Sequence, residues 1–298
     1  MPGVDRGPDS VHGDRVGAQT RETHFKGWAR PGPVVPGHAA GLRAVEGETL
    51  DALSGHCALF QLKDGHRFST DDLLTAWYGT SWCPAARTAL DLGSGLGTVA
   101  TICAWRLPGA RFVTVEAQAQ SAALARRSAA FNGLDGRYDI REGDFRDPGV
   151  LGTDERFDLV TGSPPYFSPG AGVESGHPQK LACRFELRGT VADYCRTAAR
   201  HLAVGGFFAC VFPAEAAQLE RVVAGAAAAG LVIVRRRSVV FREGDPPLIA
   251  LFGMMRAEDL PEWFRHQTWA EPDLIIRRRD GSIHPEYSAV KLAIGFPP

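Results

Sequence analysis

The stretch T-A-L-D-L-G-S-G-L-G, residues 88–97, decides the fold. Residues 88–91 form a predicted buried strand, which runs directly into a turn with three glycines, Gly93, Gly95 and Gly97. Glycines at such a turn let the backbone bend sharply and approach a ligand closely. A predicted helix, residues 98–107, follows the turn. A strand, a glycine turn and a helix in this order predict a ligand-binding edge of an α/β sheet.

The spacing of the glycines indicates which ligand is expected. The pattern is G-x-G-x-G, and Thr98 stands where a dinucleotide-binding turn has its last glycine. The carboxylate of Asp91, which opens the turn, would repel a phosphate but could orient a bound cationic group. Both features disfavour a pyrophosphate ligand.

The alternation of strands and helices extends over most of the chain. Helices are predicted at 98–107, 117–131, 191–202 and 214–229, and strands at 58–62, 88–91, 111–116, 138–144, 157–161, 206–212, 231–234 and 248–252. Ser69 and Asp72 have the spacing of a capping box before a further helix. Such alternation predicts a mainly parallel sheet with helices on both faces. The last two strands have no helix between them, so we expect them to be antiparallel neighbours.

Composition excludes several classes of protein. The chain has 298 residues, 44% of them hydrophobic, and 33 Lys and Arg balance 34 Asp and Glu. A net charge of -1 argues against a histone-like polyanion binder. Because no apolar run approaches the roughly 18 residues of a membrane span and the start has no secretory signal, we expect a cytoplasmic protein without membrane attachment. A monomer is favoured, although the sequence leaves the oligomeric state open.

The beginning of the chain differs in texture from the rest. Residues 1–45 are rich in Gly and Pro and show no persistent period, which predicts a disordered leader before one domain at 46–298. An arm that binds RNA is the alternative, because five basic residues are spread along this segment. The six cysteines have no zinc-like spacing, so we expect them to be reduced and mostly buried, with no metal.

Carboxylates end the next two predicted strands after the glycine turn. Glu116 can accept hydrogen bonds from both ribose hydroxyls of a nucleoside. Asp144 can accept from the exocyclic amine of adenine, while Phe145 packs on the ring. Because Asp91, the glycines, Glu116 and Asp144 stand at successive strand ends, they predict a nucleoside cofactor at one edge of the sheet.

The fourth strand of the series ends in Ser163-Pro164-Pro165-Tyr166. A base amine is a poor nucleophile unless acceptors for its N–H protons turn the lone pair outward, and the Ser163 hydroxyl and Pro164 carbonyl can supply them. Tyr166 can stack on the base, and Pro165 stiffens the backbone. A stiff strand-exit turn without function is the plain alternative. We find no Ser/His/Asp triad, and His177 is expected to be a solvated loop residue.

These motifs resemble those of the class I S-adenosylmethionine-dependent methyltransferases. The resemblance covers residues 60–252 and implies a Rossmann-like fold with a seven-stranded, mostly parallel sheet and an antiparallel edge strand. It implies that Asp91 and the loop with Gly93, Ser94, Gly95 and Gly97 face the methionine part of S-adenosylmethionine. Glu116 and Ala117 would then hold the ribose, Asp144 and Phe145 the adenine, and Ser163 would border the cofactor.

Three further stretches, residues 60–74, 183–186 and 274–287, resemble the bacterial valine-tRNA adenine-N6 methyltransferase family. That family implies tRNA modification, with methyl transfer to the N6 amine of an anticodon-loop adenosine. It further implies that Arg67, Phe68 and Ser69 close over the cofactor, and that Arg184 and Glu186 organise the acceptor side.

One departure from this family concerns the acceptor. The family has Asn where this chain has Ser163, and Ser-Pro-Pro-Tyr is more typical of cytosine-N4 methylation. Cytosine N4, guanine N2, a protein glutamine amide or a catalytically silent binding module therefore remain open, and a nicotinamide-dependent oxidoreductase is a more distant alternative. The arginine clusters 235–237 and 277–279 are candidates for RNA phosphates or for solvated sheet edges.

Overall fold

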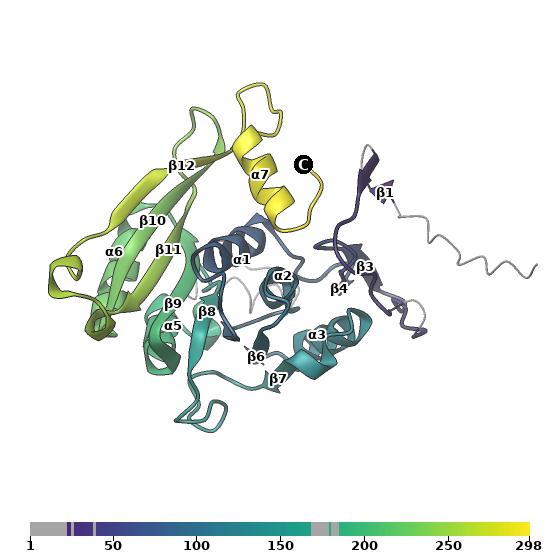
Figure 1. The fold of residues 1–298 in the computed structure, drawn as a ribbon, viewed down its shortest axis with the longest axis horizontal. Helices are drawn as coiled ribbons and strands as arrows, with labels where there is room; N and C mark the ends of the chain where they lie inside the picture. Colours follow the sequence, from purple (N-terminus) through teal and green to yellow (C-terminus); the bar gives the residue numbers. More distant parts are fainter. Residues whose placement is uncertain (1–22, 25–26, 38–39, 168–178, 180–184) are drawn as a thin grey trace, which may run out of the picture.

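In this computed structural model, residues 23–24, 27–37, 40–167, 179 and 185–298 are described. The centre of the molecule is an eight-stranded sheet with the order β12-β10-β11-β9-β8-β5-β6-β7 (Figure 1). Its strands are β5 (Thr88–Leu92), β6 (Arg111–Glu116), β7 (Tyr138–Glu142), β8 (Phe157–Gly162), β9 (Leu202–Pro213), β10 (Leu231–Arg242), β11 (Ile249–Arg256) and β12 (Trp269–Arg277). Two separate antiparallel pairs are formed by β1 (Thr23–His24) with β2 (Trp28–Ala29) and by β3 (Glu48–Ala52) with β4 (Ala58–Leu62).

The sheet is mostly parallel, as the sequence predicts. β5 pairs in parallel with β6 and β8, and the pairs β6–β7, β8–β9 and β10–β12 are also parallel. β11 runs antiparallel to both β9 and β10, which confirms that the last two predicted strands are antiparallel neighbours.

Two details of the expected sheet are wrong. It has eight strands rather than seven, and the antiparallel strand β11 lies inside the sheet rather than at its edge. The physical reason is that the tail returns as β12 and pairs with the outer side of β10. Pro272 and two acidic neighbours interrupt the apolar pattern of β12, which is an edge strand with few buried residues. That interruption hides the strand in the sequence.

Helices cover both faces of the sheet (Figure 1). One core contains residues of α1 (Thr70–Trp82), α2 (Thr98–Arg106) and α7 (Pro285–Ala293), and the other contains residues of α5 (Val191–His201) and α6 (Ala216–Ala228). α3 (Ala119–Phe131) packs against β4, β6 and β7. None of the helices in the described ranges is long and apolar enough to cross a membrane. Cys57, Cys103, Cys195 and Cys210 are buried, as expected, and Cys83 is half-buried.

The start of α1 is held by the predicted capping box. The backbone N–H of Ser69 donates to Asp72 Oδ2 across 2.9 Å, which satisfies a backbone donor outside the first turn of the helix. The box fixes where α1 begins and therefore where Asp71 and Asp72 lie.

Part of the expected leader packs on the domain. Val35 contacts the core, and a Cβ atom at Gly37 would lie 2.2 Å from the ring of Phe131. Residues 1–22, 25–26 and 38–39 lie outside the described residues. The division into a leader at 1–45 and a domain at 46–298 stays a prediction.

Candidate active site

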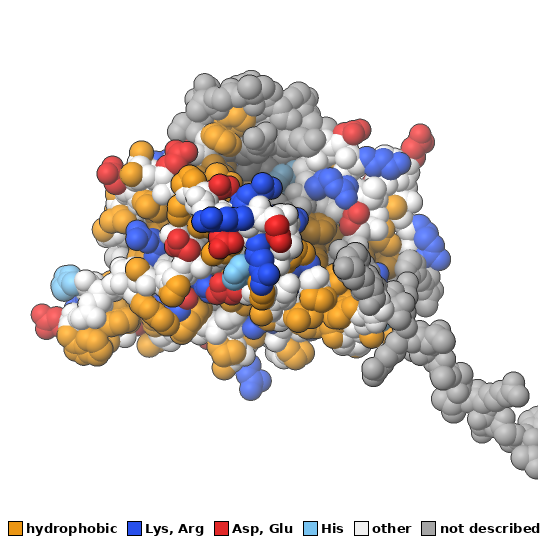
Figure 2. Space-filling model, turned by 90° about the horizontal axis from the view of Figure 1, so that it is seen from above, with side chains coloured by type: hydrophobic (Ala, Val, Ile, Leu, Met, Phe, Trp, Pro, Cys, Tyr) orange, Lys and Arg blue, Asp and Glu red, His pale blue; other side chains and the backbone are white. Residues whose placement is uncertain are grey.

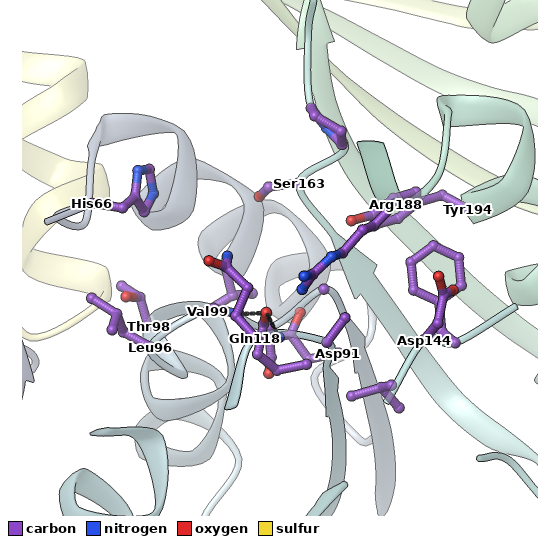
Figure 3. Close-up of a pocket in the computed structure, with 18 of the residues that line it drawn as sticks. His66, Asp91, Leu96, Thr98, Val99, Gln118, Asp144, Ser163, Arg188 and Tyr194 are labelled. Carbon is purple, nitrogen blue, oxygen red and sulfur yellow. Dashed lines mark hydrogen bonds between the residues drawn. The ribbon is translucent and has the colours of Figure 1, made fainter. Parts of the chain in front are cut away.

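Two adjoining cavities lie at the carboxyl ends of the parallel strands. The first is lined by most of the residues proposed for the cofactor, among them Asp91 and Asp144, which Figure 3 labels. The others are Gly93, Ser94, Gly95, Glu116, Ala117, Phe145 and Ser163. The second is lined by the whole Ser163–Tyr166 motif and is larger, with a volume of about 640 Å³. Both cavities are bordered by His66, Asp72, Ser163 and Pro165, which we call the seam. Ligands in the two cavities would therefore share these four residues as a common border.

Asp91 is the penultimate residue of β5 and lines the first cavity. Its side chain is buried, and Oδ1 accepts a 2.7 Å hydrogen bond from Thr161 Oγ1 on β8. Oδ2 is also buried but has no hydrogen-bond partner in the described structure. Burial raises the pKa of Asp91 to about 7, and the carboxylates of Asp72 and Glu116 add to the effect. A buried carboxylate with a free oxygen is suited to a cationic ligand.

The glycine turn gives that ligand room. Gly93 has a φ of 61°, and a Cβ there would lie 2.3 Å from Tyr194 Oη. Gly95 has a φ of 55°, and no described atom lies within 4 Å of the place where its Cβ would be. Gly97 does not line the cavity but is the N-cap residue of α2. The turn therefore leaves its backbone exposed to the cavity.

Glu116 ends β6 with both oxygens in use. Oε2 accepts from the backbone N–H of Gly95 and Oε1 from that of Gln118, each across 2.7 Å. These bonds fix the carboxylate between the glycine turn and the start of α3. Since each oxygen has a second lone pair, Glu116 can still accept hydrogen bonds from two vicinal hydroxyls.

Asp144 and Phe145 close the far end of the first cavity. Arg146 donates to Asp144 through Nε across 2.9 Å and holds the pKa of that carboxyl below its usual range. Asp144 is therefore an ionised hydrogen-bond acceptor. Phe145 is buried and packs edge-on against Tyr194, with ring centroids 4.7 Å apart. The end of the cavity thus offers an acceptor beside two aromatic rings.

The residues present fit S-adenosylmethionine. The buried Asp91 Oδ2, Ser94 Oγ and Ser163 Oγ are three polar atoms of the cavity lining without a hydrogen-bond partner in the described structure. Burying a polar atom without a partner costs free energy, so these atoms favour a polar ligand that satisfies them. Asp91 would face the charged methionine part, Glu116 the ribose and Asp144 the adenine.

Tyr166 lines the second cavity but does not project freely. Its hydroxyl donates to Asp71 Oδ2 across 2.5 Å, and its ring packs edge-on against Phe212 with a centroid distance of 5.7 Å. Burial and Asp71 raise the pKa of Tyr166 well above its ordinary value, so the hydroxyl stays protonated. The ring is therefore held in place at the wall of the second cavity.

Besides Gly97, the structure leaves three more of the predicted cofactor residues out of the first cavity, namely Arg67, Phe68 and Ser69. Arg67 and Ser69 line the second cavity, and Phe68 packs against the core. Arg67 forms an ion pair of 2.9 Å with Asp51 on β3. The positions of Arg67 and Ser69 therefore fit a role beside the acceptor rather than the cofactor.

Of the two residues expected to organise the acceptor side, Arg184 lies outside the described residues, as does His177. Glu186 lines neither cavity and forms an ion pair with Arg221 on α6. Arg221 lies 5.5 Å from the centroid of Phe212, the ring that supports Tyr166. Glu186 can therefore act on the acceptor cavity only through its neighbours.

Sequence reasoning missed several residues of the first cavity. Gln118, Arg188 and Tyr194 line it, together with His66 and Asp72 of the seam (Figure 3). Asp72 is visible in the sequence as a capping residue, and that role conceals its place at the seam. Arg188 stands in no recognisable motif, so the sequence gives no signal for it.

The two arginine clusters differ in location. Arg235 is 4% exposed and lies between the rings of Trp82 and Trp269, where it forms a 2.7 Å ion pair with Glu271. Arg237 is paired with Glu286 on α7. The expectation that this cluster meets RNA phosphates is wrong for Arg235 and Arg237, because both side chains pack against tryptophan rings and are neutralised by glutamates.

The second cluster lies at the same edge of the sheet as the cavities. Arg242 and Arg277 are register partners at the carboxyl ends of β10 and β12, and Arg278 and Arg279 follow directly. All four are exposed, and none forms an ion pair within the described residues. Phe241, next to Arg242, lines the second cavity. Figure 2 looks onto this edge, where Lys and Arg side chains gather among acidic ones.

The strand order, the glycine turn and the acidic strand ends define the fold of the class I methyltransferases, and the lining of the first cavity fits S-adenosylmethionine. A crystal structure described as a predicted O-methyltransferase from Agrobacterium tumefaciens shares this fold, with a TM-score of 0.57 and 18% identity, and covers 76% of this chain and 98% of that chain. Residues 72–182 match the family described as methyltransferase small domain.

Curated relatives match over part of the chain. A release factor glutamine methyltransferase of Geobacter sulfurreducens is 41% identical over 96 residues, which is 32% of each chain. A tRNA1(Val) (adenine(37)-N6)-methyltransferase of Porphyromonas gingivalis is 37% identical over 107 residues, 34% of this chain and 41% of that protein. One from Escherichia coli O157:H7 is 28% identical over 152 residues, 50% of this chain and 59% of that protein. The chain thus spans about one third to three fifths of the relatives that it matches.

Proposed function

We propose that the protein transfers a methyl group from S-adenosylmethionine to the N6 amine of an RNA adenosine in a tRNA anticodon loop. The main observation in support of the proposal is the seam. There Ser163 and Pro165 line both the cofactor cavity and the second cavity, which Tyr166 also lines. Two of the relatives reported above are named as tRNA adenine-N6 methyltransferases, which supports adenine N6 as the acceptor. RNA as the substrate makes the cytoplasm the expected location.

The mechanism follows from what each side chain can do. When bound, the cofactor supplies a methyl group on a positively charged sulfur, which is an excellent leaving group. Tyr166 stacks on the base and holds it flat against the seam. Ser163 and the Pro164 carbonyl accept the N–H groups of the amine and turn its lone pair toward the methyl group. Positioning of the two reactants supplies much of the rate.

The exposed arginines beside the second cavity support an RNA substrate. Arg242, Arg277, Arg278 and Arg279 lie at the edge of the sheet where an RNA loop would deliver its base, and arginine binds phosphates well. With a net charge of -1 for the whole chain, we expect the affinity to be modest and sensitive to salt.

A protein glutamine amide is the second candidate acceptor. The 41% identity to a release factor glutamine methyltransferase favours it, and an amide is a planar nitrogen that needs the same acceptors. That similarity covers 96 residues, whereas the 28% match to the adenine enzyme of Escherichia coli extends over 152.

One assay tests both candidates. The purified protein is incubated with labelled S-adenosylmethionine and either unmodified small RNA or a bacterial release factor, and the products are digested and identified by mass spectrometry. We expect labelled N6-methyladenosine. Label in cytidine, guanosine or a glutamine peptide would show that the acceptor is that group and not adenine N6. If neither the RNA nor the release factor is labelled, the proposed activity is overturned.

A further inference from the structure

We infer that Asp72 accepts the proton that the acceptor amine loses, and that it replaces the longer acceptor that Ser163 cannot provide. The inference rests on the proposed function in that it requires an amine acceptor, but it holds for any planar amine. The observation that carries it is the position of the Asp72 carboxylate at the seam, beside Ser163 and Pro165.

The position of Asp72 is fixed by local structure. It stands in the first turn of α1, and Oδ2 accepts from the backbone N–H of Ser69 across 2.9 Å. Its neighbour Asp71 is bound to the Tyr166 hydroxyl across 2.5 Å. One helix start therefore holds the ring that would carry the base and sets a carboxylate at the border with the cofactor cavity.

The reaction releases a proton that such a group can accept. The N–CH3 bond forms as the S–CH3 bond breaks, and the sulfur keeps the electron pair of that bond. The nitrogen then carries a positive charge and must release one N–H proton. A serine hydroxyl can accept a hydrogen bond but is a very weak base, whereas a carboxylate can take the proton and return it to water.

The charged and titratable groups around Asp72 influence its pKa. Asp71 lies on the same helix, His66 in the preceding loop, and Tyr166 at the exit of β8. Across the first cavity it faces Asp91, Glu116 and Arg188. Burial raises the pKa of Asp72 to about 7, with a further increase from Asp71. Below this pH the side chain is protonated and cannot accept the proton, so activity should rise as the pH increases through about 7.

The test is Asp72→Asn, which preserves size and an oxygen that can accept from Ser69. Single-turnover methyl transfer is measured from about pH 5.5 to about pH 9 with saturating S-adenosylmethionine and whichever amine substrate the wild-type protein methylates. We expect the rate above about pH 8 to fall by about 100-fold and the rising limb near pH 7 to disappear, since general bases contribute about 10²–10⁴. Cofactor affinity, measured by calorimetry, should stay within about threefold.

Matched controls separate a chemical role from a structural one. Asp193→Asn alters the equivalent capping box of α5, where Asp193 Oδ2 accepts from the backbone N–H of Thr190 across 2.8 Å, and should leave the pH profile unchanged. His66→Gln removes the other titratable group of the seam. The inference is overturned if the rising limb of the pH–rate profile persists in Asp72→Asn. It is also overturned if that limb is lost in His66→Gln instead.

The outcomes distinguish this inference from the proposed function. If the wild-type protein methylates cytidine or glutamine, adenine N6 is wrong, while the Asp72 test proceeds on that substrate. If it methylates adenosine and Asp72→Asn keeps both rate and pH limb, the function stands and the inference fails. If no amine is methylated, both are overturned.

Discussion

Thr161 Oγ1 donates a 2.7 Å hydrogen bond to Asp91 Oδ1, and this contact joins β8 to β5 directly below the cofactor cavity. The two strands are parallel neighbours in which Asp91 and Thr161 are register partners. One oxygen of the carboxylate is thereby fixed, and the other is left for the ligand. The bond couples the strand that precedes the glycine turn to the strand that precedes the Ser163–Tyr166 motif.

Removal of this carboxylate should abolish cofactor binding. For Asp91→Ala we expect the Kd for S-adenosylmethionine to rise by at least about 100-fold, since the loss of a charged partner in a buried site costs about 3 kcal/mol or more. Isothermal titration calorimetry measures the change. Asp154→Asn, an exposed aspartate in the loop before β8, should bind normally. Unchanged affinity in Asp91→Ala would refute the assigned role.

The same carboxylate should destabilise the protein when no cofactor is bound. Because the folded-state pKa of Asp91 is raised to about 7, the folded chain binds more protons than the unfolded chain between about pH 4 and 7. The free energy of unfolding should therefore fall as the pH rises through this range. In Asp91→Asn without cofactor we expect Tm to be at least about 2 °C above that of the wild type at about pH 8, with a smaller difference at about pH 5. Scanning calorimetry at both pH values gives the comparison, and an equal Tm at the higher pH would argue against a costly buried charge.

Tyr166 offers a test of base stacking. Tyr166→Ala should reduce turnover by about 10- to 100-fold with little change in cofactor affinity, because stacking of a base on an aromatic ring contributes about 1–3 kcal/mol. Tyr166→Phe keeps the ring and removes only the hydroxyl that binds Asp71, so it should lose less activity than the alanine variant. Steady-state methylation assays on both variants decide the point; equal losses would assign the role to the hydroxyl instead.

The serine of the acceptor motif can be replaced by the residue found in the adenine family. Ser163→Asn restores a longer carbonyl acceptor, and we expect a faster methylation of adenosine, by about twofold or more. If Asp72 compensates for the short serine, the Ser163→Asn substitution should also reduce the loss caused by Asp72→Asn, which a double-mutant comparison of rates would reveal. An inactive Ser163→Asn protein would mean that the site has adapted to serine.

Replacement of the exposed arginines beside the second cavity should lower the affinity for RNA and make that affinity less sensitive to salt. Arg278→Gln combined with Arg279→Gln should lower the slope of log K against log salt by about 1.4, which corresponds to about 0.7 for each contact with a single strand. Fluorescence anisotropy with an anticodon stem-loop at several salt concentrations measures the slope. Arg111→Gln, an exposed arginine at the opposite end of the parallel strands, is the control. If both proteins give the wild-type slope, this cluster does not contact phosphate.

Much of the fold is predictable because strong local sequence patterns determine it. Short-range rules predict the glycine turn, the carboxylate that ends β6 and the start of α1 after Ser69, and the structure agrees with them. The predicted carboxylate Asp144 lies just beyond the end of β7. β12 follows no such rule, since Pro272 breaks its pattern and pairing with β10 holds it in place. A long-range pairing of this kind leaves little local trace in the sequence.

The candidate site shows the same division. Asp91, Glu116 and Asp144 are predictable because the ends of parallel strands meet at one edge. The seam is not, because it depends on how α1 and the preceding loop pack over β8. For Arg235 the sequence is misleading. Its place in a run of three arginines suggests an exposed side chain, whereas Trp82 and Trp269 enclose it.

Apart from the seam, the two cavities are built from different parts of the chain. Residues 91–145 supply most of the cofactor cavity, whereas the acceptor cavity and the arginines beside it use 65–72, 163–167, 213–249 and 277–279. A substitution in the later segments can alter what is methylated and leave the methyl donor bound as before. Under the proposed function, the acceptor can therefore change while the donor site is kept.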